Sequence, residues 1–311
     1  MNYSIGIDLG GTQIRAVRID RDGQIHAHRR VATAATSGPQ VIIGQIEQLI
    51  AAMVDTLEPA QIIGIGVAST GPVDLRAGIA LQAPTIAGWV NVPLKALLEE
   101  RTGLHVELQN DANMAALGEW RFGSGHGCEH FVYVTISTGI GGGIIVDNKL
   151  LLGRHGMAGE VGHMTILPDG PICCCGNHGC WEALASGTAL AQFANEALAD
   201  GQPSLIRDIA AGTPVRGTHV AAAAERGDPL ALTLMQREGE WIGIGVANLL
   251  HMYSPERVAL GGGVSQNMAL LEPYIRRTIA ERAMPPFRDV TICAAQLGDD
   301  AGVIGAAALL L

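Results

Sequence analysis

A short segment near the middle of the chain is rich in cysteine. Cys173, Cys175 and Cys180 are separated by one and four residues, and His163 lies ten positions upstream. Three thiolates and one imidazole form a tetrahedral donor set that is typical of structural zinc. We therefore expect a closed zinc site that orders this loop.

Two neighbours leave the ligand set open. Cys174 sits between two of the proposed ligands and His178 lies in the same loop, so either side chain could replace a ligand. Cys128 and Cys293 are isolated, and we interpret them as small core residues.

Glycine-rich turns that could hold phosphate occur three times, at 8–12, 137–143 and 261–263. Paired glycines let the backbone aim N–H groups at an anion, Asp8 could hold a metal-bound water, and Thr12 could donate a hydrogen bond. One such turn alone fits a ligand-free hairpin equally well, but three together predict an ATP site. Its expected contacts are Asp8, Gly10, Gly11, Thr12, Ser137, Thr138, Gly139, Gly261, Gly262 and Gly263. The pattern is neither a Walker A loop nor a Rossmann fingerprint.

Asn110-Asp111 falls where a strand-like stretch, 104–109, meets a helical one, 112–120. A carboxylate there could accept a proton from a hydroxyl during phosphoryl transfer, and the helix amino terminus favours its charged form. Asn110 could bind adjacent hydroxyls. Taken alone, however, Asp111 fits a helix cap better than a catalytic base.

The elements that must position these residues form two similar halves. Each opens with a strand, a glycine turn and a returning strand, at 3–9 and 13–20 and again at 131–136 and 143–146. Further helices are expected at 39–57, 183–199, 229–252, 267–282 and 299–311, and further strands at 61–68 and 257–260.

This repetition predicts a duplicated α/β fold of two lobes with a central cleft. We place a small α/β lobe at 1–118, onto which the helix at 299–311 packs back, and a large α/β lobe with the zinc loop at 119–298.

Composition excludes several classes of protein. A net charge of −10 and the absence of a long basic cluster oppose nucleic-acid binding. The apolar runs are too short for a membrane-spanning helix. Since Met1-Asn2-Tyr3-Ser4 does not resemble a signal peptide, we expect a cytoplasmic protein, in which clustered cysteines favour metal over disulfides.

Four motifs together resemble the ROK family, which has the actin-like ATPase (ribonuclease H-like) fold. They are Asp8-Leu9-Gly10-Gly11-Thr12, the Ser137–Gly142 turn, Gly159-Glu160-Val161-Gly162-His163, and the cysteine segment that ends at Glu182. The resemblance implies Asp111 as the catalytic base and a sugar pocket of Gly71, Asn110, Asp111, Glu160, His163 and Glu182. It also implies zinc ligands His163, Cys173, Cys175 and Cys180, with Cys174 a non-ligand.

The function implied by this resemblance is transfer of the ATP γ-phosphate, with Mg²⁺, to the 6-hydroxyl of glucose, because the stretch 154–164 looks like that of bacterial ROK glucokinases. Kinases of N-acetylmannosamine, fructose, allose and mannose are the alternatives. A sugar-sensing ROK repressor is a remote one, since the first glycine loop starts at residue 8 and leaves no room for a helix-turn-helix. The family also implies a homo-oligomer, a dimer or tetramer.

Overall fold

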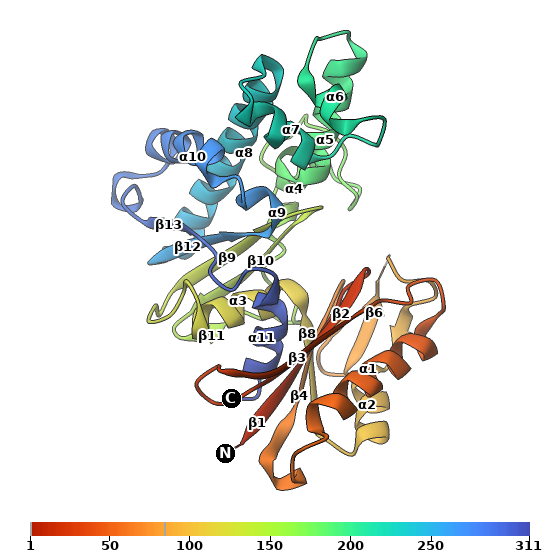
Figure 1. The fold of residues 1–311 in the computed structure, drawn as a ribbon. Coiled ribbons are helices and arrows are strands. Elements are labelled where there is room, and N and C mark those ends of the chain that lie inside the picture. Colours follow the sequence, from red (N-terminus) through yellow and green to blue (C-terminus); the bar gives the residue numbers. More distant parts are fainter. Residues whose placement is uncertain (1, 84) are drawn as a thin grey trace. The chain divides into compact units, whose positions relative to one another are not determined.

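The first of two five-stranded sheets forms around the amino-terminal strand (Figure 1). The computed structural model describes residues 2–83 and 85–311. The strands of this sheet are β1 (Tyr3–Leu9), β2 (Gln13–Ile19), β3 (Ile25–Ala32), β4 (Ile62–Ser69) and β8 (Val106–Asn110). Their order is β3-β2-β1-β4-β8, with β1 antiparallel to β2 and parallel to β4. The central strands β1 and β4 are continuous apolar runs because both of their faces are buried.

The second sheet repeats this plan. Its strands are β9 (Phe131–Ile136), β10 (Ile140–Val146), β11 (Lys149–Leu150), β12 (Arg257–Gly261) and β13 (Thr291–Ala294), in the order β11-β10-β9-β12-β13. Numbered along the chain within each sheet, both orders are third, second, first, fourth, fifth. The two sheets therefore confirm the duplicated α/β architecture predicted from the repeated strand, turn and strand.

Helices and short strands complete the chain. The α-helices are α1 (Pro39–Val54), α2 (Leu94–Thr102), α3 (Asp111–Phe122), α4 (Trp181–Ala185), α5 (Gly187–Ala199), α6 (Leu205–Ala210), α7 (Gly217–Glu225), α8 (Pro229–Tyr253), α9 (Gly262–Ser265), α10 (Met268–Arg282) and α11 (Ala301–Ala308). Among the described residues, the 3₁₀ turns are η1 (Pro59–Gln61), η2 (Val161–His163), η3 (Pro285–Phe287) and η4 (Gly298–Asp300). A three-stranded sheet comprises β5 (Val73–Asp74), β6 (Ile79–Gln82) and β7 (Val90–Val92).

One predicted helix is interrupted. The periodicity at 183–199 suggested a single helix, but the structure ends α4 at Ala185 and begins α5 at Gly187. Ser186 lies between them in an extended conformation, and its hydroxyl accepts a hydrogen bond from the backbone N–H of Ala189. The prediction was wrong because the helical spacing of apolar residues continues across Ser186. That spacing does not reveal that the serine caps a new helix.

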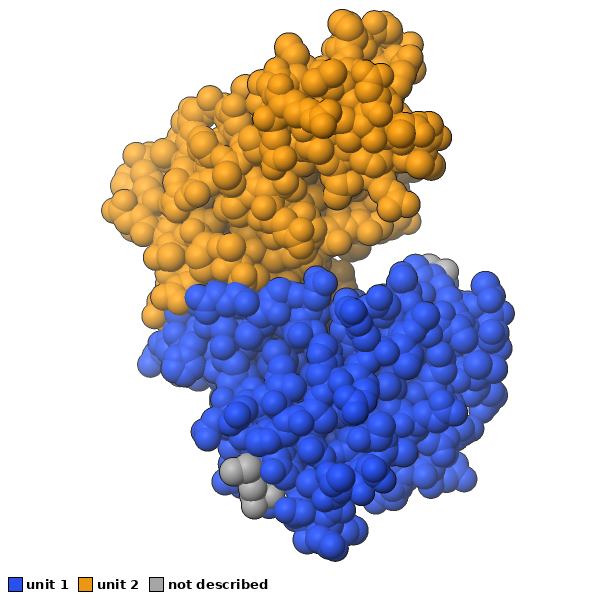
Figure 2. Space-filling view, viewed as in Figure 1, with its two compact units in different colours: residues 1–129, 143–159, 296–311 blue, residues 130–142, 160–295 orange. Residues whose placement is uncertain are grey.

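The chain divides into two compact units, which Figure 2 shows in different colours. Unit 1 comprises residues 1–129, 143–159 and 296–311, and unit 2 comprises 130–142 and 160–295. In unit 1, α11 packs on α3 and β1, so the carboxyl-terminal helix shares a core with the amino-terminal strand. The predicted boundary between the small and large lobes at residue 118 stays a prediction, because the two compact units are not the same thing as the two predicted lobes. Across the part of the chain that the structure describes, no helix has the length and apolar character needed to cross a membrane.

Candidate active site and metal centre

The amino terminus of α3 carries the predicted base. Asn110 is the N-cap residue, and its Oδ1 accepts hydrogen bonds from the backbone N–H groups of Ala112 at 2.9 Å and Asn113 at 3.3 Å. Asp111 occupies the first helical position, where its Oδ1 accepts from the N–H of Ala112 at 2.8 Å. Asn110 is thus the residue that caps α3. The carboxylate of Asp111 lies at the amino terminus of the helix, where negative charge is favoured.

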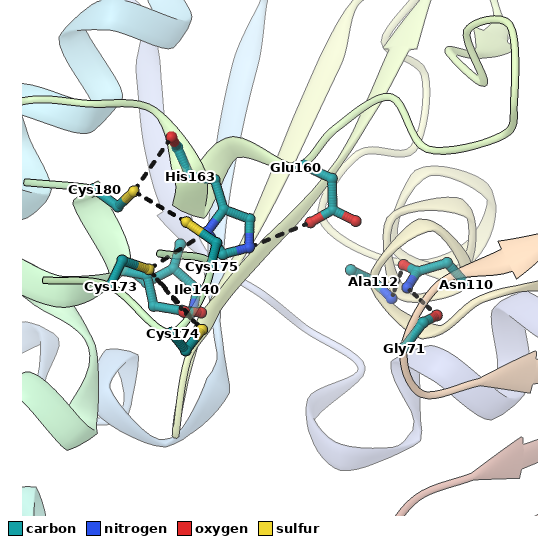
Figure 3. A network of polar contacts seen from close by, with 11 residues as sticks. Gly71, Asn110, Ala112, Ile140, Glu160, His163, Cys173, Cys174, Cys175 and Cys180 are labelled. Carbon is teal, nitrogen blue, oxygen red and sulfur yellow. Dashed lines mark hydrogen bonds and ion pairs between the residues drawn. The ribbon is translucent and has the colours of Figure 1, made fainter. Parts of the chain in front are cut away.

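A glycine turn after β4 is tied to this cap. The side-chain Nδ2 of Asn110 donates to the carbonyl oxygen of Gly71 at 3.3 Å (Figure 3). Gly71 has φ of +81°, and a Cβ there would lie 2.1 Å from the carbonyl oxygen of Gln82. Only glycine fits this position, so the turn that presents the Gly71 carbonyl to Asn110 depends on it.

The first predicted phosphate loop joins β1 to β2 in unit 1. Thr33 holds it from the side, because its hydroxyl donates to the carbonyl oxygen of Gly10 at 2.7 Å and its N–H donates to that of Thr12 at 2.9 Å. Asp8 precedes the turn, and its Oδ2 accepts from Arg15 Nη1 at 3.2 Å. Burial raises the pKa of Asp8, although the charge of Arg15 opposes that shift.

The cysteine loop of unit 2 brings four possible metal ligands together. His163 Nδ1 lies 3.6 Å from Cys173 Sγ, Cys175 Sγ lies 3.6 Å from Cys180 Sγ, and the four ligand atoms all lie within 4.8 Å of one another (Figure 3). Sulfur atoms bound tetrahedrally to zinc at about 2.3 Å would be about 3.8 Å apart. The donor set and its spacing therefore fit zinc.

The two residues that left the ligand set open each have another polar partner. His178 Nδ1 faces the carbonyl oxygen of Gly170 at 3.1 Å. The exposed Cys174 directs its thiol to Glu182 Oε1 at 3.2 Å, and this hydrogen bond raises the pKa of Cys174 to about 12. Cys173, Cys174 and Glu182 also form a second group that could hold a metal ion.

His163 and Glu160 come from η2 and its N-cap. The Nε2 atom of His163 lies 4.0 Å from Glu160 Oε2, on the opposite edge of the imidazole from Cys173 (Figure 3). One imidazole can therefore serve a metal through Nδ1 while Nε2 remains directed to a polar partner.

The second predicted phosphate loop joins β9 to β10 and contacts Glu182 directly. Glu182 Oε2 accepts a hydrogen bond from the backbone N–H of Ile140 at 2.8 Å. A Cβ at Gly139 would lie 2.3 Å from that same oxygen, so the carboxylate packs against a bare backbone that only glycine provides.

A pocket of about 490 Å³ opens beside this loop, entirely within unit 2. Of the ATP-binding residues predicted in this unit, Ser137, Thr138 and Gly263 line it, whereas Gly139, Gly261 and Gly262 do not. The remaining lining residues are Gly187, Thr188, Leu190, Ala191, Val215, Arg216, Gly217, Thr218, Ala221, Met235, Val264 and Asn267. An apolar pocket with a few polar groups and one arginine is suited to a nucleotide.

Sequence reasoning missed most of this pocket. Thr188, Arg216 and Asn267 come from three separate segments that meet only in the folded chain. The one available signal was Ser186-Gly187-Thr188, a cap-like sequence whose Gly187 N–H donates to the carbonyl oxygen of Ser137 at 2.7 Å. Nothing in the sequence singled out Arg216.

Fold and site together define a duplicated α/β protein with glycine-turn loops, a nucleotide-sized pocket and a His/Cys cluster. The ROK family model matches residues 4–311, and the chain belongs to the ROK family. The actin-like ATPase fold implied by the sequence motifs is thereby confirmed.

Several known relatives match over nearly their full length. The chain is 38% identical over 309 residues to a glucokinase of Thermotoga maritima, covering 98% of this chain and 96% of that protein. A Streptomyces griseus ROK glucokinase, solved with glucose and AMPPNP, is 37% identical with a TM-score of 0.81 and 99% coverage of both chains. An N-acetylmannosamine kinase of Citrobacter koseri is 32% identical, with 98% coverage of both.

Proposed function

We propose that the chain is a glucokinase, an ATP-dependent sugar kinase that transfers the γ-phosphate of ATP to the 6-hydroxyl of glucose. The observation that carries this proposal is the similarity, over almost the whole chain, to a relative named glucokinase and to a glucokinase solved with glucose and AMPPNP. Several of the predicted functional residues add a chemical rationale for this proposal.

Asp111 is the catalytic base. Its carboxylate lies at the amino terminus of α3, where the helix dipole favours the ionised form that accepts a proton. Asn110 supplies the N-cap, and Asp111 occupies the first helical position beside it. As the 6-hydroxyl attacks phosphorus, its proton passes to Asp111, and the bond between the γ-phosphorus and the bridging oxygen of ADP breaks.

The predicted sugar contacts of unit 1 are Gly71, Asn110 and Asp111, of which Gly71 and Asn110 share a hydrogen bond. Those of unit 2 are Glu160, His163 and Glu182, of which Glu160 and His163 lie side by side. A hexose presents several hydroxyls in fixed directions, so carboxylate, amide and imidazole groups together can orient it. The Nε2 edge of His163 suits this role because the other ring nitrogen faces Cys173.

The pocket of unit 2 takes the nucleoside of ATP, and the glycine loop beside it, 137–143, takes phosphates. Apolar Leu190, Ala221 and Met235 can pack on an adenine, while Ser137 and Thr138 present polar groups at the phosphate end. The partly buried carboxylate of Asp8 suits a metal-bound water of Mg²⁺, an ion that would neutralise phosphate charge when bound.

Zinc is the ion that His163, Cys173, Cys175 and Cys180 would hold. Three thiolates and one imidazole fill a tetrahedral shell, which is typical of a structural site. The zinc orders the loop that carries both His163 and the start of α4, where Glu182 lies.

A second candidate function is N-acetylmannosamine kinase, favoured by the relative that bears that name. The two functions differ in the sugar alone, so the test is a panel of glucose, mannose, fructose, allose, N-acetylglucosamine and N-acetylmannosamine with ATP. We expect the largest kcat/KM for glucose. A larger value for N-acetylmannosamine would establish the second candidate instead. Assembly as a dimer or tetramer, a cytoplasmic location and the lack of nucleic-acid binding stay predictions.

A further inference from the structure

Glu182 joins two functional loops of unit 2. Each carboxylate oxygen has its own donor: the backbone N–H of Ile140 donates to Oε2 at 2.8 Å, and the thiol of Cys174 donates to Oε1 at 3.2 Å. Ile140 lies in the second predicted phosphate loop, 137–143, whereas Cys174 lies in the cysteine loop (Figure 3). Two donors on two oxygens fix the plane of a carboxylate as well as its position.

Cys174 is the cysteine suited to this contact. Cys173 Sγ is farther from Glu182 Oε1, at 3.8 Å, and as a zinc ligand it would be a thiolate with no proton to donate. Cys174 is exposed and lies outside the His163, Cys173, Cys175 and Cys180 group. Its Sγ lies 3.2 Å from Glu182 Oε1, which is within hydrogen-bonding distance.

The phosphate loop is also held on its other side. The N–H of Gly187 donates to the carbonyl oxygen of Ser137 at 2.7 Å, and the hydroxyl of Thr188 donates to that of Thr138 at 2.7 Å. The start of α5 thus anchors the first half of the loop, and Glu182 anchors its second half at Ile140.

We propose that Cys174 is a positioning residue that holds Glu182 in place and so connects the cysteine loop to the phosphate loop. This inference rests on the proposed sugar kinase function, in which Glu182 contacts the sugar and the loop contacts ATP. Without the thiol, Oε1 loses its donor, the carboxylate can rotate, and the Ile140 contact weakens.

The experiment compares the holoenzyme with its Cys174→Ala and Cys174→Ser variants, with Cys293→Ser as a control cysteine in β13. We expect Cys174→Ala to raise KM for glucose and for ATP about three- to tenfold, the loss of roughly one hydrogen bond. Its kcat should stay within about twofold, because Asp111 is untouched. Cys174→Ser keeps a donor and should recover most of both affinities, and Cys293→Ser should match the parent.

Two measurements separate positioning from other roles. Metal analysis should find as much zinc in Cys174→Ala as in the parent. Hydrogen exchange without substrates should be faster in the segment 137–143 of Cys174→Ala, because the Ile140 N–H is less protected. This exchange does not depend on the sugar, so it tests the inference even if the parent fails to phosphorylate glucose.

Three results would overturn the inference. Unchanged KM values and unchanged exchange in Cys174→Ala would show that the thiol does not position Glu182. Loss of zinc in that variant would make Cys174 a metal ligand. A Cys174→Ser variant as impaired as Cys174→Ala would show that the hydrogen-bond donor is not what matters.

Discussion

At the scale of single residues, the role proposed for Asp111 depends on the neighbour that precedes it. Asn110 satisfies the first N–H groups of α3, so the next carboxylate stands at a helix amino terminus without serving as the cap. The sequence located both residues at a junction of strand and helix. It could not separate cap from base, because either residue type caps helices and only the hydrogen bonds of the folded chain distinguish them.

Asp111→Asn tests that assignment. Asparagine keeps the size of the side chain but cannot accept the hydroxyl proton, so we expect kcat to fall by about 10²- to 10⁴-fold with glucose affinity largely retained. Steady-state kinetics and glucose titration measure the two effects. Asp55→Asn, a change of an exposed acid in the same unit, is the matched control. Near-normal turnover in Asp111→Asn would remove it as the base.

The grouping of the four proposed metal ligands was predictable because these residues are close in sequence. His163 and the three cysteines lie within one short segment, and zinc chemistry limits the spacings that can work. The lining of the nucleotide pocket was not predictable. Thr188, Arg216 and Asn267 are brought together by tertiary packing, which leaves no local pattern.

At the scale of elements, the apolar strands and the long periodic helices were predicted well. α1, α8 and α10 show clear helical spacing, and β1, β4 and β9 are short apolar runs. β3 was missed because it is largely exposed and carries polar residues such as His28 and Arg29. The strands of the small sheet have two to four residues each, too few to show any period.

The zinc loop gives a prediction at this scale. Replacing the ligand in Cys175→Ser should lower the zinc content and the melting temperature, because metal binding contributes directly to the stability of a closed site. Metal analysis and thermal unfolding are the measurements, with Cys293→Ser as control. Zinc-free parent protein and a Cys175→Ser variant of equal stability would together contradict the site.

The start of α8 gives a second prediction at the scale of elements. Asp228 accepts from the N–H groups of Ala231 and Leu205, each at 2.8 Å, and from Ser204 Oγ at 2.9 Å. Burial opposes ionisation, but these hydrogen bonds outweigh it and lower the pKa of Asp228. Its stabilisation is therefore present above the unfolded pKa of about 3.9 and is lost as pH falls through the lower folded pKa.

We expect Asp228→Asn to reduce the free energy of unfolding by about 1 to 2 kcal/mol at neutral pH. The difference from the parent should shrink as the pH is lowered toward the folded pKa. Denaturant unfolding across pH measures both effects, and Asp289→Asn, at an exposed position of unit 2, is the control. A difference that is constant with pH would mean that the charge of Asp228 is not involved.

At the scale of the whole molecule, duplication was visible in the sequence as two glycine turns between strands. The two five-stranded sheets have the same strand order, so the repeated sequence pattern corresponds to a repeated fold. Oligomeric state was not predictable from residue patterns, since it depends on surfaces and not on motifs. The preferred sugar also depends on the shape of the binding site, which no motif determines.

The most direct test of the central claim is the identity of the product. Purified protein is incubated with ATP, Mg²⁺ and glucose, and phosphorus NMR identifies where phosphate is attached, with 6-deoxyglucose as the matched control. We predict glucose 6-phosphate in amounts equal to the ADP formed, and no sugar phosphate from 6-deoxyglucose. ADP formed without glucose 6-phosphate, or phosphate on another hydroxyl, would contradict the account.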